Sequence, residues 1–215
     1  MFGGSRIRQK LYITEPAKER AFLVAADVKS ERRRNGNWGV EDSLEELGML
    51  AQTAGAEIVG AAVQHLEKPQ PASYVGAGKL REIAELRKHL GYTLIVFDDE
   101  LSPSQQRNLE EELEVKVLDR TALILDIFAQ HAHTKEGRLQ VELAQHQYLL
   151  PRLRGQWSHL ERLEGRIGTR GPGESQLETD RRLIGRKIQK LKQELEQVRK
   201  QRSLYRRRRA KQGVA

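Results

Sequence analysis

The run Thr93-Leu94-Ile95-Val96-Phe97 decides the fold class of this chain. Its last four residues are all apolar, and such a run predicts a strand that is buried on both faces of a sheet. Working outward from it, three more short apolar runs of strand type lie at residues 21–28, 57–63 and 115–118. The sequence therefore predicts four strands.

Segments with helical spacing of apolar residues lie next to these runs. They cover residues 43–54, 78–90, 102–113 and 121–132. In the first, Leu44, Leu47 and Leu50 recur every three residues, which is typical of a helix with one buried face. Parallel neighbours in a sheet need such helical crossovers. We therefore expect residues 1–133 to form an α/β domain with a small four-stranded, mainly parallel sheet.

Charge divides the 215 residues into two parts. Residues 1–133 contain 17 Lys and Arg against 21 Asp and Glu, a net charge of −4. Residues 134–215 contain 21 Lys and Arg against 9 Asp and Glu, a net charge of +12. This segregation predicts two modules, of which the second faces a polyanion.

Composition also excludes several classes of protein. The chain has no Cys, which rules out disulfides and thiolate metal sites. No apolar run approaches the ~20 residues of a membrane span, and residues 1–10 lack the apolar core of a secretory signal. His131 and His133 have no acidic ligand at metal spacing, so we expect no metal site. The expectation is a cytoplasmic, monomeric protein without a membrane span.

From Leu139 onward the apolar period changes to that of a coiled coil. Apolar residues recur at alternating spacings of four and three, first as far as Leu160 and again from Leu177 to Tyr205. This 3.5-residue repeat is typical of helices that bury one stripe against a partner helix. Two such stretches around one loop predict that residues 134–215 form a long antiparallel coiled-coil helical hairpin.

The two hairpin helices carry further local signals. Ser175 and Glu178 have capping-box spacing, which predicts that the second helix begins at Ser175. Pro151 and Gly155 predict a kink in the first helix. The repeat is also typical of an intermolecular coiled coil, which leaves a protein-interaction scaffold as one alternative.

The loop between the helices, residues 165–175, forms the predicted tip of the hairpin. Four glycines and two arginines fall within its first ten residues. Glycines let a backbone approach another surface closely, and guanidinium forks suit phosphates and stacked bases. The arginines in and beside the tip are Arg162, Arg166, Arg170, Arg181 and Arg182. We interpret the tip as a loop that reaches into a polyanionic cleft.

Four separated motifs resemble those of HflX-type GTPases. They are residues 74–79, 118–130, 137–145 and 168–182, in family order along the chain. The last begins Gly168-Thr169-Arg170-Gly171-Pro172-Gly173-Glu174-Ser175. Two departures are small, because Arg166 adds charge where glycine is common and Ser175 caps a helix as the usual threonine would.

This resemblance implies the N-terminal α/β subdomain and helical hairpin of a GTPase that binds the large ribosomal subunit. In that family the hairpin loop reaches toward the peptidyl transferase centre, and the protein splits or rescues stalled ribosomes. The implied partner of the tip is 23S-type rRNA. The candidate RNA-binding residues are Arg162, Arg166, Gly168, Thr169, Arg170, Gly171, Gly173, Arg181 and Arg182.

The phosphate-binding loop of a GTPase, Gly-x-x-x-x-Gly-Lys-Ser/Thr, does not occur in this sequence. The nearest approach, residues 73–80, has Ser73 in place of the first glycine and Leu80 in place of the hydroxyl that binds magnesium. We therefore expect the family's GTPase domain, with its GTP and Mg²⁺, to begin after Ala215. No catalytic residue and no cofactor is assigned to the present segment.

Gly76, Gly78 and Lys79 leave a second alternative open. They lie between a predicted strand and a predicted helix, where the amides of a helix N-terminus can bind phosphate. The run Asp98-Asp99-Glu100 follows another strand and resembles a set of metal-binding acids. Together these features permit an α/β domain that binds or hydrolyses a nucleotide.

Overall fold

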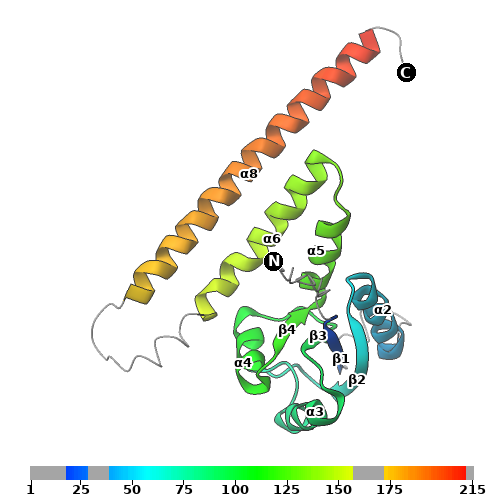
Figure 1. Ribbon diagram of the computed structural model, residues 1–215. Coiled ribbons are helices and arrows are strands. Elements are labelled where there is room, and N and C mark those ends of the chain that lie inside the picture. Colours follow the sequence, from blue (N-terminus) through cyan, green and yellow to red (C-terminus); the bar gives the residue numbers. More distant parts are fainter. Residues whose placement is uncertain (1–17, 29–38, 157–171, 212–215) are drawn as a thin grey trace, which may run out of the picture.

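The computed structural model describes residues 18–28, 39–156 and 172–211, and Figure 1 shows their arrangement. Four strands form one sheet: β1 (Arg20–Val28), β2 (Glu57–Leu66), β3 (Leu94–Phe97) and β4 (Lys116–Asp119). Their order is β2-β1-β3-β4, and each neighbouring pair is parallel. The predicted four-stranded parallel sheet is confirmed.

Four helices cover the two faces of this sheet. They are α2 (Val40–Thr53), α3 (Ala77–Leu90), α4 (Pro103–Leu113) and α5 (Arg120–His131). Ile83 of α3 and Leu109 of α4 are buried against one face. Leu47 of α2 and Leu123 of α5 are buried against the other. All four residues of β3 are buried, as a strand between two layers of helices requires.

Two long helices follow the α/β domain, namely α6 (Lys135–Gln156) and α8 (Pro172–Lys211). They lie side by side in Figure 1 and pack through an apolar seam. Leu139 of α6 is buried there with Leu191 and Leu195 of α8. These residues occupy the predicted heptad positions, so the repeat correctly identified the packed face.

Ion pairs fix the relative direction of the two helices. Glu142 of α6 pairs with Lys187 of α8 at 2.8 Å, and Glu136 pairs with Arg202 at 2.6 Å. Because residue numbers fall along α6 as they rise along α8, the two helices are antiparallel. The predicted seam position of Tyr205 is wrong, since this side chain is 62% exposed. Its partner is missing because α6 begins at Lys135.

The boundaries of the long helices differ from those that the local signals predict. Helix α8 begins at Pro172, three residues before the predicted start at Ser175. Proline suits the first turn of a helix, because its fixed φ is helical and its missing N–H would have no partner there. Helix α6 is continuous through Pro151 as far as Gln156.

Helix α6 belongs to both parts of the molecule. Besides α8, it contacts α4 and α5 of the α/β domain. The hairpin is therefore packed on the α/β domain through its first helix. No helix in the described ranges is both long and apolar enough to cross a membrane.

Candidate nucleic-acid interface

Most of the predicted tip lies outside the described residues. This applies to Arg162, Arg166, Gly168, Thr169, Arg170 and Gly171. Gly173 lies in the first turn of α8, so the helical part of the molecule extends into the predicted tip. Arg181 and Arg182 follow on the same helix, and both are exposed.

The environment of Arg182 leaves its charge available to a partner. Its guanidinium pairs with Glu178 one turn earlier at 2.6 Å, and both side chains are largely exposed. Exposed pairs of this kind contribute only about 0.3–0.5 kcal/mol, so an anionic partner can displace the carboxylate at little cost. Arg181 and Arg182 are thus two exposed cations near the N-terminal end of α8.

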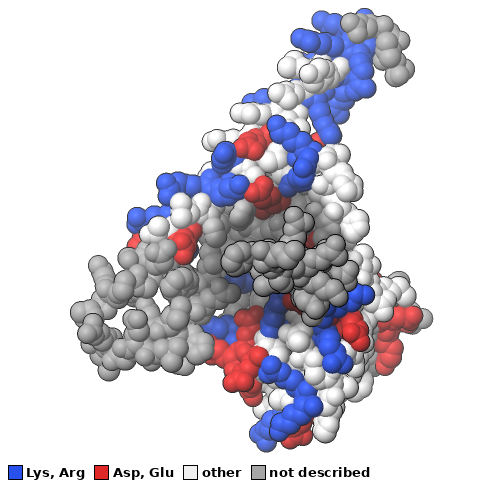
Figure 2. All heavy atoms as spheres, viewed as in Figure 1, with Lys and Arg blue, Asp and Glu red and all other residues white. Residues whose placement is uncertain are grey.

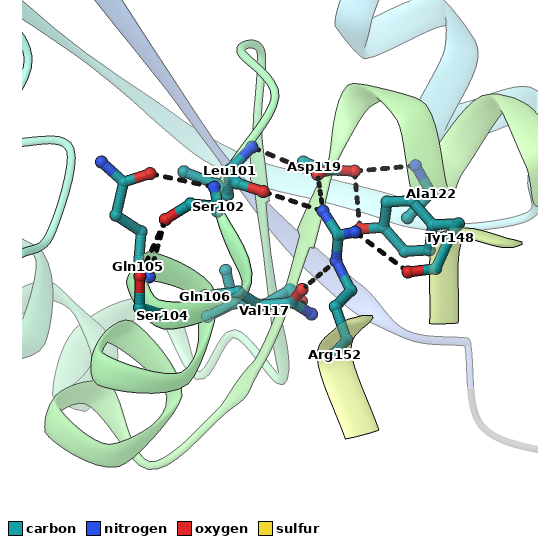
Figure 3. A network of polar contacts seen from close by, with 10 residues as sticks. All are labelled: Leu101, Ser102, Ser104, Gln105, Gln106, Val117, Asp119, Ala122, Tyr148 and Arg152. Carbon is teal, nitrogen blue, oxygen red and sulfur yellow. Dashed lines mark hydrogen bonds and ion pairs between the residues drawn. The ribbon is translucent and has the colours of Figure 1, made fainter. Parts of the chain in front are cut away.

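A buried polar cluster, which we call the Asp119 node, holds the C-terminal part of α6 on the α/β domain (Figure 3). Asp119 ends β4 and is fully buried. One carboxylate oxygen accepts a 2.8 Å hydrogen bond from the backbone N–H of Ala122, which caps the N-terminus of α5. The other accepts a 3.2 Å bond from the backbone N–H of Leu101. The carboxylate therefore ties the end of the sheet to two neighbouring segments.

Arg152 of α6 completes the charge balance of the Asp119 node. Its guanidinium pairs with Asp119 at 3.0 Å and donates to the carbonyl of Leu101 at 2.8 Å. Its Nε donates to the side-chain oxygen of Gln106 in α4 at 2.9 Å. The fork geometry of a guanidinium lets one side chain satisfy all these acceptors at once. Arg152 thereby links α6 to α4 and to the end of β4.

Tyr148 lies one turn before Arg152 and supplies the third side chain of the Asp119 node. Its hydroxyl donates a 2.8 Å hydrogen bond to Asp119. Burial, and then the adjacent Asp119 carboxylate, raise the pKa of Tyr148 well above its ordinary value, so the hydroxyl stays a donor at neutral pH. The guanidinium of Arg152 stacks on the Tyr148 ring, 3.4 Å from its centroid. These contacts fix how the C-terminal part of α6 lies on the α/β domain.

Asp98, the first residue of the acidic run after β3, is held by side chains of two helices. Asp98 accepts a 2.6 Å hydrogen bond from the Ser43 hydroxyl and pairs with Arg120 at 2.7 Å. Arg120 also pairs with Glu46 at 2.7 Å, so the cluster joins α2, α5 and the end of β3. Within the described part of the chain, no group of three or more His, Asp or Glu residues is arranged to hold a metal ion.

The glycine-rich turn before α3 is likewise engaged within the protein. Gly76 is the residue before the helix, and its N–H donates to the Gln64 side chain at 2.9 Å. Lys79 pairs with Glu82 at 2.8 Å, and its side chain is only 19% exposed. An added Cβ at Gly78 would meet open space. These contacts give Gly76 and Lys79 structural roles, and a phosphate site at this turn stays a prediction.

Comparison with known families assigns the two parts of the chain separately. Residues 41–129 match the family described as GTP-binding GTPase N-terminal, and residues 131–209 match the GTP-binding GTPase Middle Region. GTPase HflX of Escherichia coli is 50% identical over 173 residues, covering 80% of this chain and 41% of that protein. The chain belongs to the HflX family.

Other relatives agree with this assignment. GTPase HflX of Lacrimispora saccharolytica is 50% identical to this HflX-family chain over 197 residues, which are 92% of this chain and 45% of that protein. GTPase HflX of Flavobacterium psychrophilum is 50% identical over 167 residues, which are 78% and 40% of the two chains. The chain thus spans less than half the length of these relatives.

Solved structures support the fold. A GTP-binding protein of the archaeon Sulfolobus solfataricus, solved in complex with GDP, superimposes with a TM-score of 0.54 at 24% identity. The match covers 84% of this HflX-family chain and 46% of that protein.

Sequence reasoning missed the Asp119 node. One local signal existed, because an aspartate between a strand and a helix is a common helix N-cap. Nothing in the sequence around Tyr148 and Arg152 indicates their partner, which lies 29 and 33 residues earlier.

Proposed function

We propose that this chain is the ribosome-binding part of an HflX-type GTPase. It contacts 23S-type rRNA of the large subunit near the peptidyl transferase centre through the tip at residues 165–175, and it serves ribosome splitting or rescue in the cytoplasm. The observation that carries the proposal is the mounting of the tip. A glycine- and arginine-rich stretch of sequence joins two long helices, and the Asp119 node anchors the end of α6 that leads into this stretch.

The mounting suits a deep polyanionic site. Helix α8 is 40 residues long, which corresponds to about 60 Å. A paired, anchored helix loses little conformational entropy on binding, so the cost of placing the tip is small. Arg181 and Arg182, exposed beside the tip, add positive charge along the same path. Nucleotide binding and hydrolysis are proposed only for the whole GTPase, because the sequence of this chain lacks the phosphate-binding loop. No step of that reaction is assigned to its residues.

Substitution of the tip arginines tests the proposal. The variant R166A/R170A should sediment with the large ribosomal subunit at least tenfold more weakly, with unchanged circular dichroism, since each lost phosphate contact also removes a counterion-release contribution. The matched control R186A/K190A removes two exposed cations from the middle of α8. Unchanged sedimentation of R166A/R170A would overturn the proposal.

The interaction-scaffold alternative requires the seam to be free for a second chain. In the structure Leu191 and Leu195 are instead buried against α6 of the same chain. We therefore propose a monomer, and sedimentation equilibrium should give a mass near 24.6 kDa. A concentration-dependent dimer that dissociates on L195E substitution would favour the scaffold.

A further inference from the structure

The C-terminal end of α8 extends beyond its partner helix (Figure 1). The last ion pair between the two helices joins Arg202 to Glu136, the second residue of α6. Residues 203–211 of α8 continue past this point. Leu204 and Tyr205 are accordingly 57% and 62% exposed. This segment is a projecting helix end with uncovered side chains.

The projecting end is strongly and uniformly basic. Residues 203–211 contain five Lys and Arg and no Asp or Glu, and the preceding residues 197–202 add three more cations and no acid. Figure 2 shows these cations gathered at the far end of the long helix. Among the described residues, no ion pair involves any of Arg206–Arg209, and all four are exposed. The positive charge is therefore not neutralised by the described part of the protein.

The cations continue the line of the seam. Leu191, Leu195 and Val198 line the packed face of α8. The next heptad positions are Arg202, Tyr205 and Arg209. Apolar side chains thus give way to arginine and tyrosine where α8 passes the N-terminal start of α6. A face prepared for another protein helix would remain apolar, so this change indicates an anionic partner.

Four arginines near the C-terminal end of α8 lie on one face of the helix. At 100° per residue, Arg199, Arg202, Arg206 and Arg209 follow one another at spacings of three and four, with Tyr205 beside them. The row is about 15 Å long, because ten residues each rise about 1.5 Å.

We propose that Arg199, Arg202, Tyr205, Arg206 and Arg209 form a second RNA-backbone contact, which we call the arginine row. Guanidinium forks bind phosphate oxygens in pairs, and the exposed Tyr205 ring can stack on an unpaired base. The row begins about 40 Å along α8 from the start of that helix, so it engages a different RNA segment from the tip. The choice of RNA over DNA rests on the proposed function; the recognition of a phosphate backbone does not.

The test uses the whole chain and a 20-base-pair RNA duplex as the probe. In the variant R206Q/R209Q the Arg202–Glu136 pair is untouched, so the helix pair keeps its structure. Fluorescence anisotropy between 50 and 200 mM KCl should show about tenfold weaker binding, and the slope of log K against log salt should fall by about two. The matched control R186Q/K190Q removes the same charge from another face of α8 and should change affinity less than twofold.

Three outcomes decide between the interpretations. Unchanged affinity and salt slope in R206Q/R209Q, with a loss in R166A/R170A, would overturn the arginine row and leave the tip proposal standing. A loss in R206Q/R209Q with normal sedimentation of R166A/R170A would support the row and overturn the tip. Displacement of the RNA by poly-glutamate at equal charge concentration would overturn the assignment to nucleic acid in favour of an acidic protein surface. In R206K/R209K most of the salt slope should return, because lysine keeps the charge without the fork.

Discussion

The two faces of α6 are held by different physics. Toward α8 the helix packs leucines, and the ion pairs beside them are at the surface. Toward the α/β domain it presents Tyr148 and Arg152 to the fully buried Asp119. Apolar packing is tolerant of small shifts, whereas a buried charge pair demands its partners at fixed positions. The contrast suggests that the seam supplies stiffness to the hairpin and the Asp119 node supplies its direction.

Removal of the Asp119 carboxylate should cause the largest loss of stability, because it disrupts the polar face of α6 and leaves the apolar face unchanged. The variant D119A leaves the Arg152 guanidinium and the Tyr148 hydroxyl buried without their acceptor, and it also removes the cap of α5. We expect a loss of about 3–5 kcal/mol in the free energy of unfolding, measured by urea titration.

A milder pair of variants keeps this prediction testable if D119A does not fold. D119N and R152M should each destabilise the chain, and D119N/R152M should lose less than the sum of the two, because no charge is then left unpaired. Additive losses would show that Asp119 and Arg152 act independently.

Shortening a seam leucine should lower the free energy of unfolding by a smaller amount, and the loss of protection should be confined to the helix pair. Leu191 is 2% exposed, but only three residues of the seam cluster are fully buried, which lets the site relax. L191A should cost about 2–3 kcal/mol. Hydrogen exchange should rise in α8 and remain slow in β3, whereas L183A, at a position that is 51% exposed, should change neither. Equal loss of protection in β3 would show that the hairpin and the sheet unfold as one unit.

Alkaline pH offers the mildest probe of the Asp119 node. The pKa of Tyr148 is raised from 10.0, first by burial and then by the Asp119 charge, so the folded state holds its phenolic proton more tightly than the unfolded state. Stability from this source is complete below about pH 10 and falls as pH rises further, by at most about 1.4 kcal/mol per pH unit and by less for a partly exposed ring. In Y148F the fall should be shallower, with a remainder from Tyr92, whose pKa burial also raises. Identical pH profiles for Y148F and the parent chain would remove Tyr148 from the explanation.

Much of the fold could be predicted because its signals are local. The order of strands and helices follows from short apolar runs and helical spacings, and the parallel sheet follows from the crossovers between them. Local signals failed where tertiary geometry intervened. Ser175 has good capping spacing, yet α8 begins at Pro172. Tyr205 fits the heptads, yet α6 begins only at Lys135 and leaves this side chain 62% exposed.

The candidate site divides in the same way. The basic tip, the arginines of the projecting helix end and the family motifs are all visible as residue types at fixed spacing. The Asp98 environment was not visible, because its partner Arg120 lies on another element that only folding brings near. The Lys79–Glu82 pair is different, since it lies within α3 at a spacing of three residues that the sequence shows. A run of acidic residues or glycines indicates which ligands it could bind. The side chains that the fold packs around it determine whether its groups are free to bind them.

The sequence by itself determined the element order, the parallel sheet, the apolar stripes of the two long helices and the concentration of positive charge in residues 134–215. These properties depend on periodicity and composition, which act over a few turns of chain. Only the tertiary structure decided how α6 packs on the α/β domain. That packing depends on Asp119 meeting Tyr148 and Arg152 across 29 and 33 residues, a contact between single side chains that no repeating pattern encodes.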